Sequence, residues 1–125
     1  MTPRPILELT TVNIGAPDPG ALARFYELLL GWKIRVEEPD WVVLKNPADG
    51  VTLSFQTESS YVRPVWPPEP AKQQMMLHLE IRVEDLRAAA EHAMACGATF
   101  ADHQPQEDVR VFLDPAGHPF CLWLG

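Results

Sequence analysis

VNIGAPDPGALARFYELLLGW (residues 12–32) and LEIRVEDLRAAAEHAMACGATF (residues 79–100) indicate the fold most directly, because both stretches contain the same signals in the same order. Each begins with the alternation of apolar and polar residues that is typical of a strand. Asp18 and Asp85 follow, and aspartate is a preferred residue at helix N-termini. A helical apolar pattern then runs to a glycine, which is typical of a helix end. The two stretches therefore predict one strand–helix unit that occurs twice.

Extended segments follow each predicted helix and complete the unit. The predicted strands cover residues 7–14, 32–38, 41–45 and 51–57 in the first half, and residues 76–83, 98–102, 109–113 and 119–123 in the second half. This order predicts an α+β fold with two tandem βαβββ modules that together form a cup-shaped mixed sheet. We expect one domain over residues 1–125, with module 1 at about 5–57, a linker at about 58–74 and module 2 at about 75–125.

Composition limits the partners of the chain. Its 125 residues suit one domain, and its net charge of −7 with no cluster of Lys or Arg argues against binding to nucleic acid. The N-terminal sequence lacks the pattern of a signal peptide, and no apolar run reaches the roughly 18 residues of a membrane span. The two cysteines show no metal-binding or disulfide spacing. We therefore expect a cytoplasmic protein with no membrane partner.

The outer faces of the two sheets are the expected binding surface. Each helix must bury its apolar stripe on one face of the strands of its own module, which leaves the other face half polar and half aromatic. Two such faces placed together enclose a cup. Concave surfaces with a few polar groups among aromatic ones are the usual setting for small-molecule binding.

Both stretches quoted above, with DPAGHPFCLW at residues 114–123, resemble the glyoxalase/bleomycin-resistance superfamily, also called the vicinal oxygen chelate superfamily. The resemblance covers essentially the whole chain. It implies paired βαβββ modules whose curved sheets form a cleft, in which a divalent metal often holds two neighbouring oxygens of a substrate. It also implies a homodimer, a common assembly in this superfamily.

The resemblance implies where metal ligands would lie. The first-strand ligand stands seven residues before the capping aspartate, at Thr11 in module 1 and His78 in module 2. The last-strand ligand, usually Glu in the family, corresponds to Cys121 in module 2 and to either Ser54 or Gln56 in module 1. Most of these residues depart from the pattern of the family.

This departure argues against the chemistry best known in the family. Mg, Mn and non-haem Fe sites favour carboxylate and imidazole donors, and glyoxalase chemistry needs a carboxylate base beside the metal. We therefore expect no true glyoxalase I activity. Two roles stay open for His78: it lines a metal-free pocket, or it joins Gln56 and Glu80 in holding a divalent metal. Glu80 alternatively pairs with Arg82 or Arg110.

Two aromatic residues on predicted strands also have two interpretations. Trp41 and Phe112 offer stacking surfaces for a planar ligand if they face the cup, and they belong to the core if they face the helices. Cys121 is a small buried apolar residue or, less commonly, a nucleophile. The predicted ligand-contacting residues are Thr11, Trp41, Ser54, Gln56, His78, Phe112 and Cys121. The sequence names no catalytic residue.

The leading hypothesis is a glyoxalase-like protein that binds a small aromatic or apolar molecule in its cup without a metal. The second is a metal-assisted lyase or isomerase, or a dioxygenase-like enzyme, that uses His78. The third is a dimeric interaction module without catalysis. Metal content separates the first two hypotheses, and a collapsed cup would favour the third.

Overall fold

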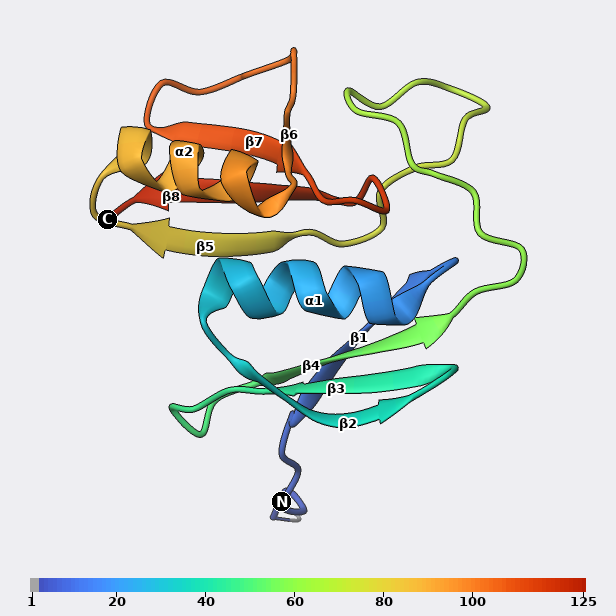
Figure 1. Ribbon diagram of the computed structural model, residues 1–125. Coiled ribbons are helices and arrows are strands. Elements are labelled where there is room, and N and C mark those ends of the chain that lie inside the picture. The colour runs from blue at the N-terminus through green and yellow to red at the C-terminus, as the bar shows by residue number, and fades with distance from the viewer. Residues whose placement is uncertain (1–2) are drawn as a thin grey trace.

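The computed structural model describes residues 3–125, which form two four-stranded mixed sheets and two helices (Figure 1). Module 1 consists of β1 (Thr11–Ala16), α1 (Pro19–Leu30), β2 (Lys33–Glu38), β3 (Trp41–Lys45) and β4 (Thr52–Thr57). Module 2 consists of β5 (Leu79–Val83), α2 (Leu86–Cys96), β6 (Thr99–Phe100), β7 (Val109–Leu113) and β8 (Pro119–Leu124). The predicted α+β fold with two βαβββ modules is confirmed.

The two sheets have the same topology. Their strand orders are β1-β4-β3-β2 and β5-β8-β7-β6. In each sheet the first strand of the module lies at an edge and runs parallel to the last strand, while the other neighbours are antiparallel. Each module thus contributes a separate sheet, and the first strands of the two sheets, β1 and β5, are both edge strands.

Local signals place both helices where the sequence predicts them. The Asp18 and Asp85 side chains each accept a hydrogen bond from the backbone N–H three residues later, at 3.1 and 3.0 Å. Gly31 and Gly97 end the helices with φ angles of 72° and 117°, a conformation that costs other residues energy. Both caps are therefore confirmed.

The first strand of each module begins later than predicted. Residues 7–10 and 76–78 are not in strands, although their apolar–polar alternation favours one. Their neighbours β4 and β8 begin only at Thr52 and Pro119, so residues 7–10, 76 and 77 have no strand to pair with. His78 lies opposite Pro119, which has no backbone N–H to donate. The predicted strand at 98–102 is likewise reduced to the two residues of β6.

A single hydrophobic core joins the modules through α1. The ring of Phe25 lies 5.9 Å from the ring of Phe120 in β8, whereas Tyr26 stacks on Phe55 in β4 at 5.8 Å. All four residues are at most 3% exposed. In Figure 1, α1 lies between β5 and the sheet of module 1, as these contacts require. The helix therefore holds the two sheets against each other.

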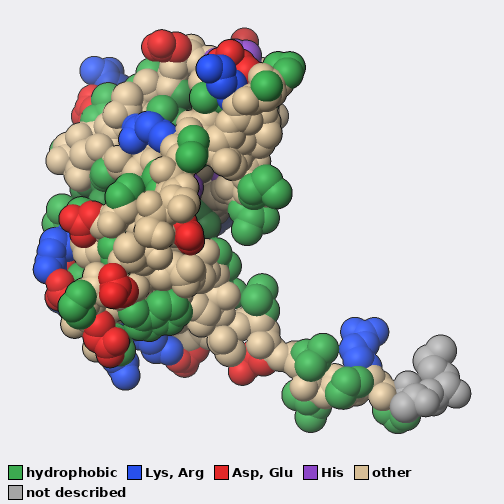
Figure 2. All heavy atoms as spheres, turned by 90° about the vertical axis from the view of Figure 1, so that its right-hand side faces the viewer, with side chains coloured by type: hydrophobic (Ala, Val, Ile, Leu, Met, Phe, Trp, Pro, Cys, Tyr) green, Lys and Arg blue, Asp and Glu red, His purple; other side chains and the backbone are tan. Residues whose placement is uncertain are grey.

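The N-terminal arm, residues 3–10, projects away from this body, with hydrophobic side chains along it (Figure 2). Ile6, Leu7 and Leu9 are 98%, 82% and 74% exposed. Clustered exposed apolar side chains on an extended segment are unusual for a surface that faces only water.

Candidate functional site

The outer face of the module 1 sheet gathers four of the predicted ligand-contacting residues. Strand pairing places Trp41 opposite Gln56. Alternation along β1 places Thr11 on the same face as Asn13 and Gly15, which pair with Ser54 and Gln56. Asn13, which the prediction did not include, donates from Nδ2 to Ser54 Oγ at 2.8 Å. Ser54 is fully buried on this face, whereas Trp41 supplies an aromatic ring that is 38% exposed.

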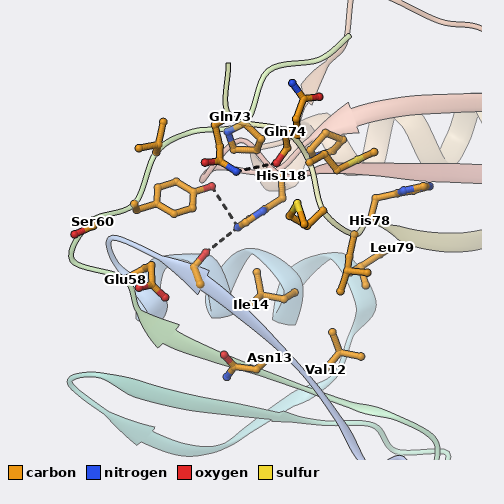
Figure 3. A pocket seen from close by; sticks show the side chains of 18 of the residues that line it. Val12, Asn13, Ile14, Glu58, Ser60, Gln73, Gln74, His78, Leu79 and His118 are labelled. Carbon is orange, nitrogen blue, oxygen red and sulfur yellow. Dashed lines mark hydrogen bonds between the residues drawn. The ribbon is translucent and has the colours of Figure 1, made fainter. Parts of the chain in front are cut away.

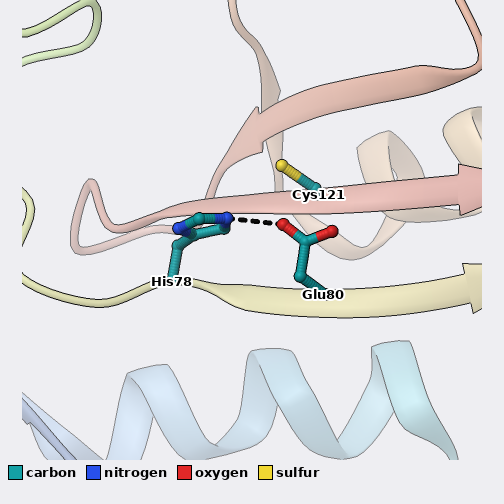
Figure 4. Close-up of side chains that lie close together, drawn as sticks. All are labelled: His78, Glu80 and Cys121. Atoms are coloured by element: carbon teal, nitrogen blue, oxygen red, sulfur yellow. Dashed lines mark hydrogen bonds and ion pairs between the residues drawn. The ribbon is translucent and has the colours of Figure 1, made fainter.

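The outer face of the module 2 sheet brings His78, Glu80 and Cys121 together (Figure 4). Glu80 in β5 pairs with Cys121 in β8, and His78 precedes β5 by one residue. His78 Nε2 lies 2.5 Å from Glu80 Oε2, and one ligand atom from each of the three residues lies within 4.8 Å of the others. Glu80 therefore pairs with His78 rather than with Arg82 or Arg110.

Cys121 carries a protonated thiol and not a reactive thiolate. Burial raises the pKa of the Cys121 thiol to about 11, and the negative charge of Glu80 adds to this rise. Gln56, predicted as a further metal ligand, lies on the other sheet, where its amide donates to Glu58 at 3.5 Å. In the part of the chain that the structure describes, the metal-type donors that cluster are thus His78, Glu80 and Cys121.

Phe112 lies in the core and not on a binding face. Its side chain is fully buried and stacks on Phe120, with ring centroids 5.9 Å apart and planes 23° from parallel. Phe112 and Phe120 are register partners and share the face of the sheet that the helices cover. The predicted contact between Phe112 and a ligand is therefore wrong, and the core interpretation holds.

A cavity of about 450 Å³ lies where the two modules meet (Figure 3). β1, the linker, the start of β5 and the turn before β8 form its walls. The lining residues are Val12, Asn13, Ile14, Gly15, Tyr26, Glu58, Ser60, Tyr61, Val62, Pro64, Gln73, Gln74, Met75, Met76, Leu77, His78, Leu79, His118 and Pro119. Of the predicted ligand-contacting residues, only His78 is among them. The linker, which sequence reasoning treated as a connection, supplies much of the wall.

His118 lies at the centre of the cavity wall and was not predicted as a site residue. Its Nε2 lies 2.8 Å from the carbonyl oxygen of Gly15. Because a carbonyl can only accept, this contact requires a proton on Nε2. Tyr61 donates its hydroxyl proton to the Ala116 carbonyl at 2.6 Å, and its oxygen lies 3.3 Å from His118 Nε2. Module 1, the linker and module 2 meet at this histidine.

Asp114 fixes the turn that carries His118. Its Oδ1 accepts hydrogen bonds from the backbone N–H groups of Ala116 and His118, both at 3.0 Å. Its Oδ2 accepts from the hydroxyl of Tyr26 at 2.7 Å. Asp114 is 1% exposed, and burial raises its pKa, although these hydrogen bonds and the charge of His118 act in the opposite direction. The DPAGH motif therefore builds a rigid turn beneath the cavity.

The charge of the cavity wall is negative. Glu58 contributes a carboxylate, and none of the described residues that line the cavity is Lys or Arg. Burial raises the pKa of Tyr61 to about 12, and the negative charge of Asp114 adds to this rise. Tyr61 therefore contributes a neutral hydroxyl. The remaining wall is apolar or neutral, with Met75 and Met76 at the linker side.

No helix among the described residues has the length and apolarity needed to cross a membrane. Comparison with curated proteins gave no match. The sequence profile of the glyoxalase-like domain matches residues 11–123.

Solved structures with the same fold cover nearly the whole chain. A glyoxalase-related enzyme from Fulvimarina pelagi is 19% identical with a TM-score of 0.68, over 96% of this chain and 89% of that one. A glyoxalase/bleomycin resistance protein/dioxygenase family enzyme from Burkholderia phytofirmans is 18% identical with a TM-score of 0.69, over 94% and 98%. The fosfomycin resistance protein from Mesorhizobium loti is 16% identical with a TM-score of 0.68, over 96% and 93%.

At these identities the structures show a shared fold, whereas the profile match covers most of the sequence itself. It begins at the first residue of β1 and ends in β8, so both modules lie within it. The chain belongs to the glyoxalase-like domain family of the vicinal oxygen chelate superfamily.

Proposed function

We propose that this protein binds a small, mainly apolar organic molecule in the cavity between its two modules, and that binding needs no metal. The cavity itself is the observation that supports this proposal. Its volume of about 450 Å³ falls within the range of roughly 300–1,000 Å³ that is usual for small-molecule sites. Its wall combines many apolar side chains with a few polar ones, which is the usual composition of such sites.

The arrangement of the wall suits binding better than glyoxalase chemistry. Methionine side chains adapt to irregular apolar surfaces, and Met75 and Met76 form one side of the cavity. His118 is held in place by Gly15 on one side and by the Asp114 turn on the other. A fixed polar group within an apolar wall orients a ligand, at about 1 kcal/mol for each hydrogen bond.

The proposal can be tested with the neutral fluorescent probe N-phenyl-1-naphthylamine in the presence of EDTA. We expect its emission to rise on binding and the ¹³C-methyl NMR signals of Met75 and Met76 to shift. Met94 lies on α2 outside the cavity and is the internal control. The His78→Ala variant should bind more weakly, whereas Trp41→Ala should not, because Trp41 is outside the cavity wall. Binding that requires an added metal, or that leaves both methionine signals unchanged, would contradict the proposal.

A metal-assisted reaction is the second candidate function, and the cluster of His78, Glu80 and Cys121 favours it. Nitrogen, oxygen and thiolate sulfur are all zinc ligands, and a site with three protein ligands leaves a position open for substrate. Tetrahedral ligands at zinc distances are about 3.5 Å apart, so atoms within 4.8 Å of one another need only small movements. The soft sulfur donor suits zinc better than Mg or Mn. Bound zinc would polarise a substrate oxygen.

Metal analysis of untreated protein tests this second candidate. We expect about one zinc for each chain if it is correct, and loss of that zinc in both Cys121→Ser and His78→Ala. The Cys96→Ser variant is the matched control, because Cys96 lies on α2, away from the cluster. Metal-free protein that also takes up no added zinc would exclude this candidate.

A further inference from the structure

Three polar side chains of the cavity wall, those of Asn13, Tyr61 and His118, each use a donor within the protein. Asn13 donates from its amide nitrogen to Ser54 Oγ at 2.8 Å. Tyr61 donates to the Ala116 carbonyl at 2.6 Å, and His118 Nε2 donates to the Gly15 carbonyl at 2.8 Å. Among the described residues, no protein donor contacts Asn13 Oδ1 or His118 Nδ1. Asn13 Oδ1 is therefore free to accept a hydrogen bond, and so is His118 Nδ1 when the imidazole is neutral.

The two glutamines of the linker wall follow the same rule. Gln73 Nε2 donates to the Gln74 carbonyl at 2.9 Å. Gln74 Nε2 donates to the carbonyls of Glu69 and Lys72, at 2.5 and 3.1 Å. These bonds shape the linker and use one N–H of Gln73 and two contacts of Gln74 Nε2. Among the described residues, neither side-chain oxygen has a protein donor, so both can accept from a ligand.

Charge adds to this imbalance between donors and acceptors. Glu58 carries a carboxylate on the wall beside Gly15: a Cβ atom built on that glycine would lie 3.3 Å from Glu58 Oε2. The carboxylate therefore lies beside Gly15, the residue of β1 whose carbonyl accepts from His118. No described lining residue is Lys or Arg, and the whole chain carries a net charge of −7. A negative field attracts cations and repels anions over the approach to the cavity.

We infer that the cavity selects ligands that present hydrogen-bond donors, and above all a protonated amine joined to an apolar body. The amine lies against Glu58 and the free acceptor of Asn13, while the apolar body packs on the methionine side of the wall. A carboxylate or phosphate in the same place would meet acceptors and a like charge. This inference rests on the proposed function, because it names the ligand class of the same cavity.

Three probes with one apolar body test the inference: 4-phenylbutylamine, 4-phenylbutan-1-ol and 4-phenylbutanoate, at pH 7 by calorimetry. An ion pair at a partly exposed carboxylate contributes up to about fivefold in affinity. We therefore expect the amine to bind about fivefold more tightly than the alcohol, and the carboxylate to bind more weakly than both. Shifts of the Met75 and Met76 methyl signals identify the cavity as the place of binding.

A pair of isosteric variants isolates the charge. Glu58→Gln should bring the affinity of the amine to within about twofold of the alcohol. Glu91→Gln, an equal change of net charge on the exposed face of α2, should leave the ratio near fivefold. Equal binding of all three probes in the cavity, or equal effects of the two variants, would overturn the inference while the proposed function stands. Failure of all three probes to shift the methionine signals would overturn both.

Discussion

The hydrogen bond between Tyr26 and Asp114 ties α1 of module 1 to the DPAGH turn of module 2, and Tyr26→Phe removes it without changing the shape of the core. The hydroxyl lies 2.7 Å from Asp114 Oδ2, and both residues are 1% exposed. Water therefore cannot replace the lost donor. A hydrogen bond to a charged group contributes about 1.5–3 kcal/mol, so we expect the free energy of unfolding to fall by about 2 kcal/mol at pH 7. For a chain of this size that corresponds to a Tm lower by roughly 8 °C.

The loss should depend on pH, because Asp114 titrates. Burial raises the pKa of Asp114, whereas the charge of His118 and the Tyr26 hydrogen bond lower it. Without the Tyr26 donor, the pKa of Asp114 in the folded protein is higher still. The folded variant then binds a proton at a pH where the folded wild type does not, so the variant regains stability relative to the wild type as pH falls. The difference in unfolding free energy is therefore largest at neutral pH and smaller near about pH 4.5.

Urea unfolding followed by tryptophan fluorescence, at about pH 7 and about pH 4.5, measures both quantities. The control is the same Tyr26→Phe change in an Asp114→Asn background, which has no carboxyl group to titrate at this position. There the cost should be the same at both pH values. A cost below about 0.5 kcal/mol in the wild-type background would refute the assigned role of the Asp114 carboxylate. A pH dependence that persists in the Asp114→Asn background would refute it as well.

Three other measurements address separate features of the molecule. Gly31→Ala should lower the free energy of unfolding by about 1 kcal/mol, because the φ of this residue is 72°. Gly20→Ala inside α1 should raise it by about 0.5 kcal/mol, and thermal unfolding measures both changes. Sedimentation should show a dimer. The double variant Leu7→Glu, Leu9→Glu should dimerise more weakly, because these exposed apolar side chains of the arm need an apolar partner. A wild-type monomer at micromolar concentration would contradict this. Cys96 and Cys121 should both label in denaturant without reductant, whereas unreactive thiols would reveal a bridge that the structure lacks.

The helices could be predicted to the residue because their ends depend on local chemistry. A capping aspartate and a left-handed glycine act within one turn of the chain, so Asp18, Gly31, Asp85 and Gly97 carry the information themselves. Strand ends depend on a partner elsewhere. Residues 7–10 alternate as a strand should, yet the neighbouring strand begins only opposite Thr11, and no local pattern reports that.

The outer faces of the sheets could be predicted in part for a related reason. Alternation places Ser54 with Gln56, and His78 with Glu80, on one face whatever the rest of the fold does. It does not say which face the helices cover. The position of Phe112 was therefore ambiguous from the sequence, and its register with Phe120 places both rings in the core.

The cavity could not be predicted from the sequence, because its polar centre depends on contacts between distant parts of the chain. His118 bonds to Gly15, 103 residues away, and to Tyr61 in a linker whose composition indicated only a connection. One local signal was available: an aspartate four residues before His118 can accept its backbone N–H and hold the turn, as Asp114 does at 3.0 Å. That signal predicts a fixed histidine but not what it faces. The direction of the ring follows from the packing of the two modules on α1, so the ligand-binding chemistry proposed for this chain arises from how its repeats are joined rather than from either repeat alone.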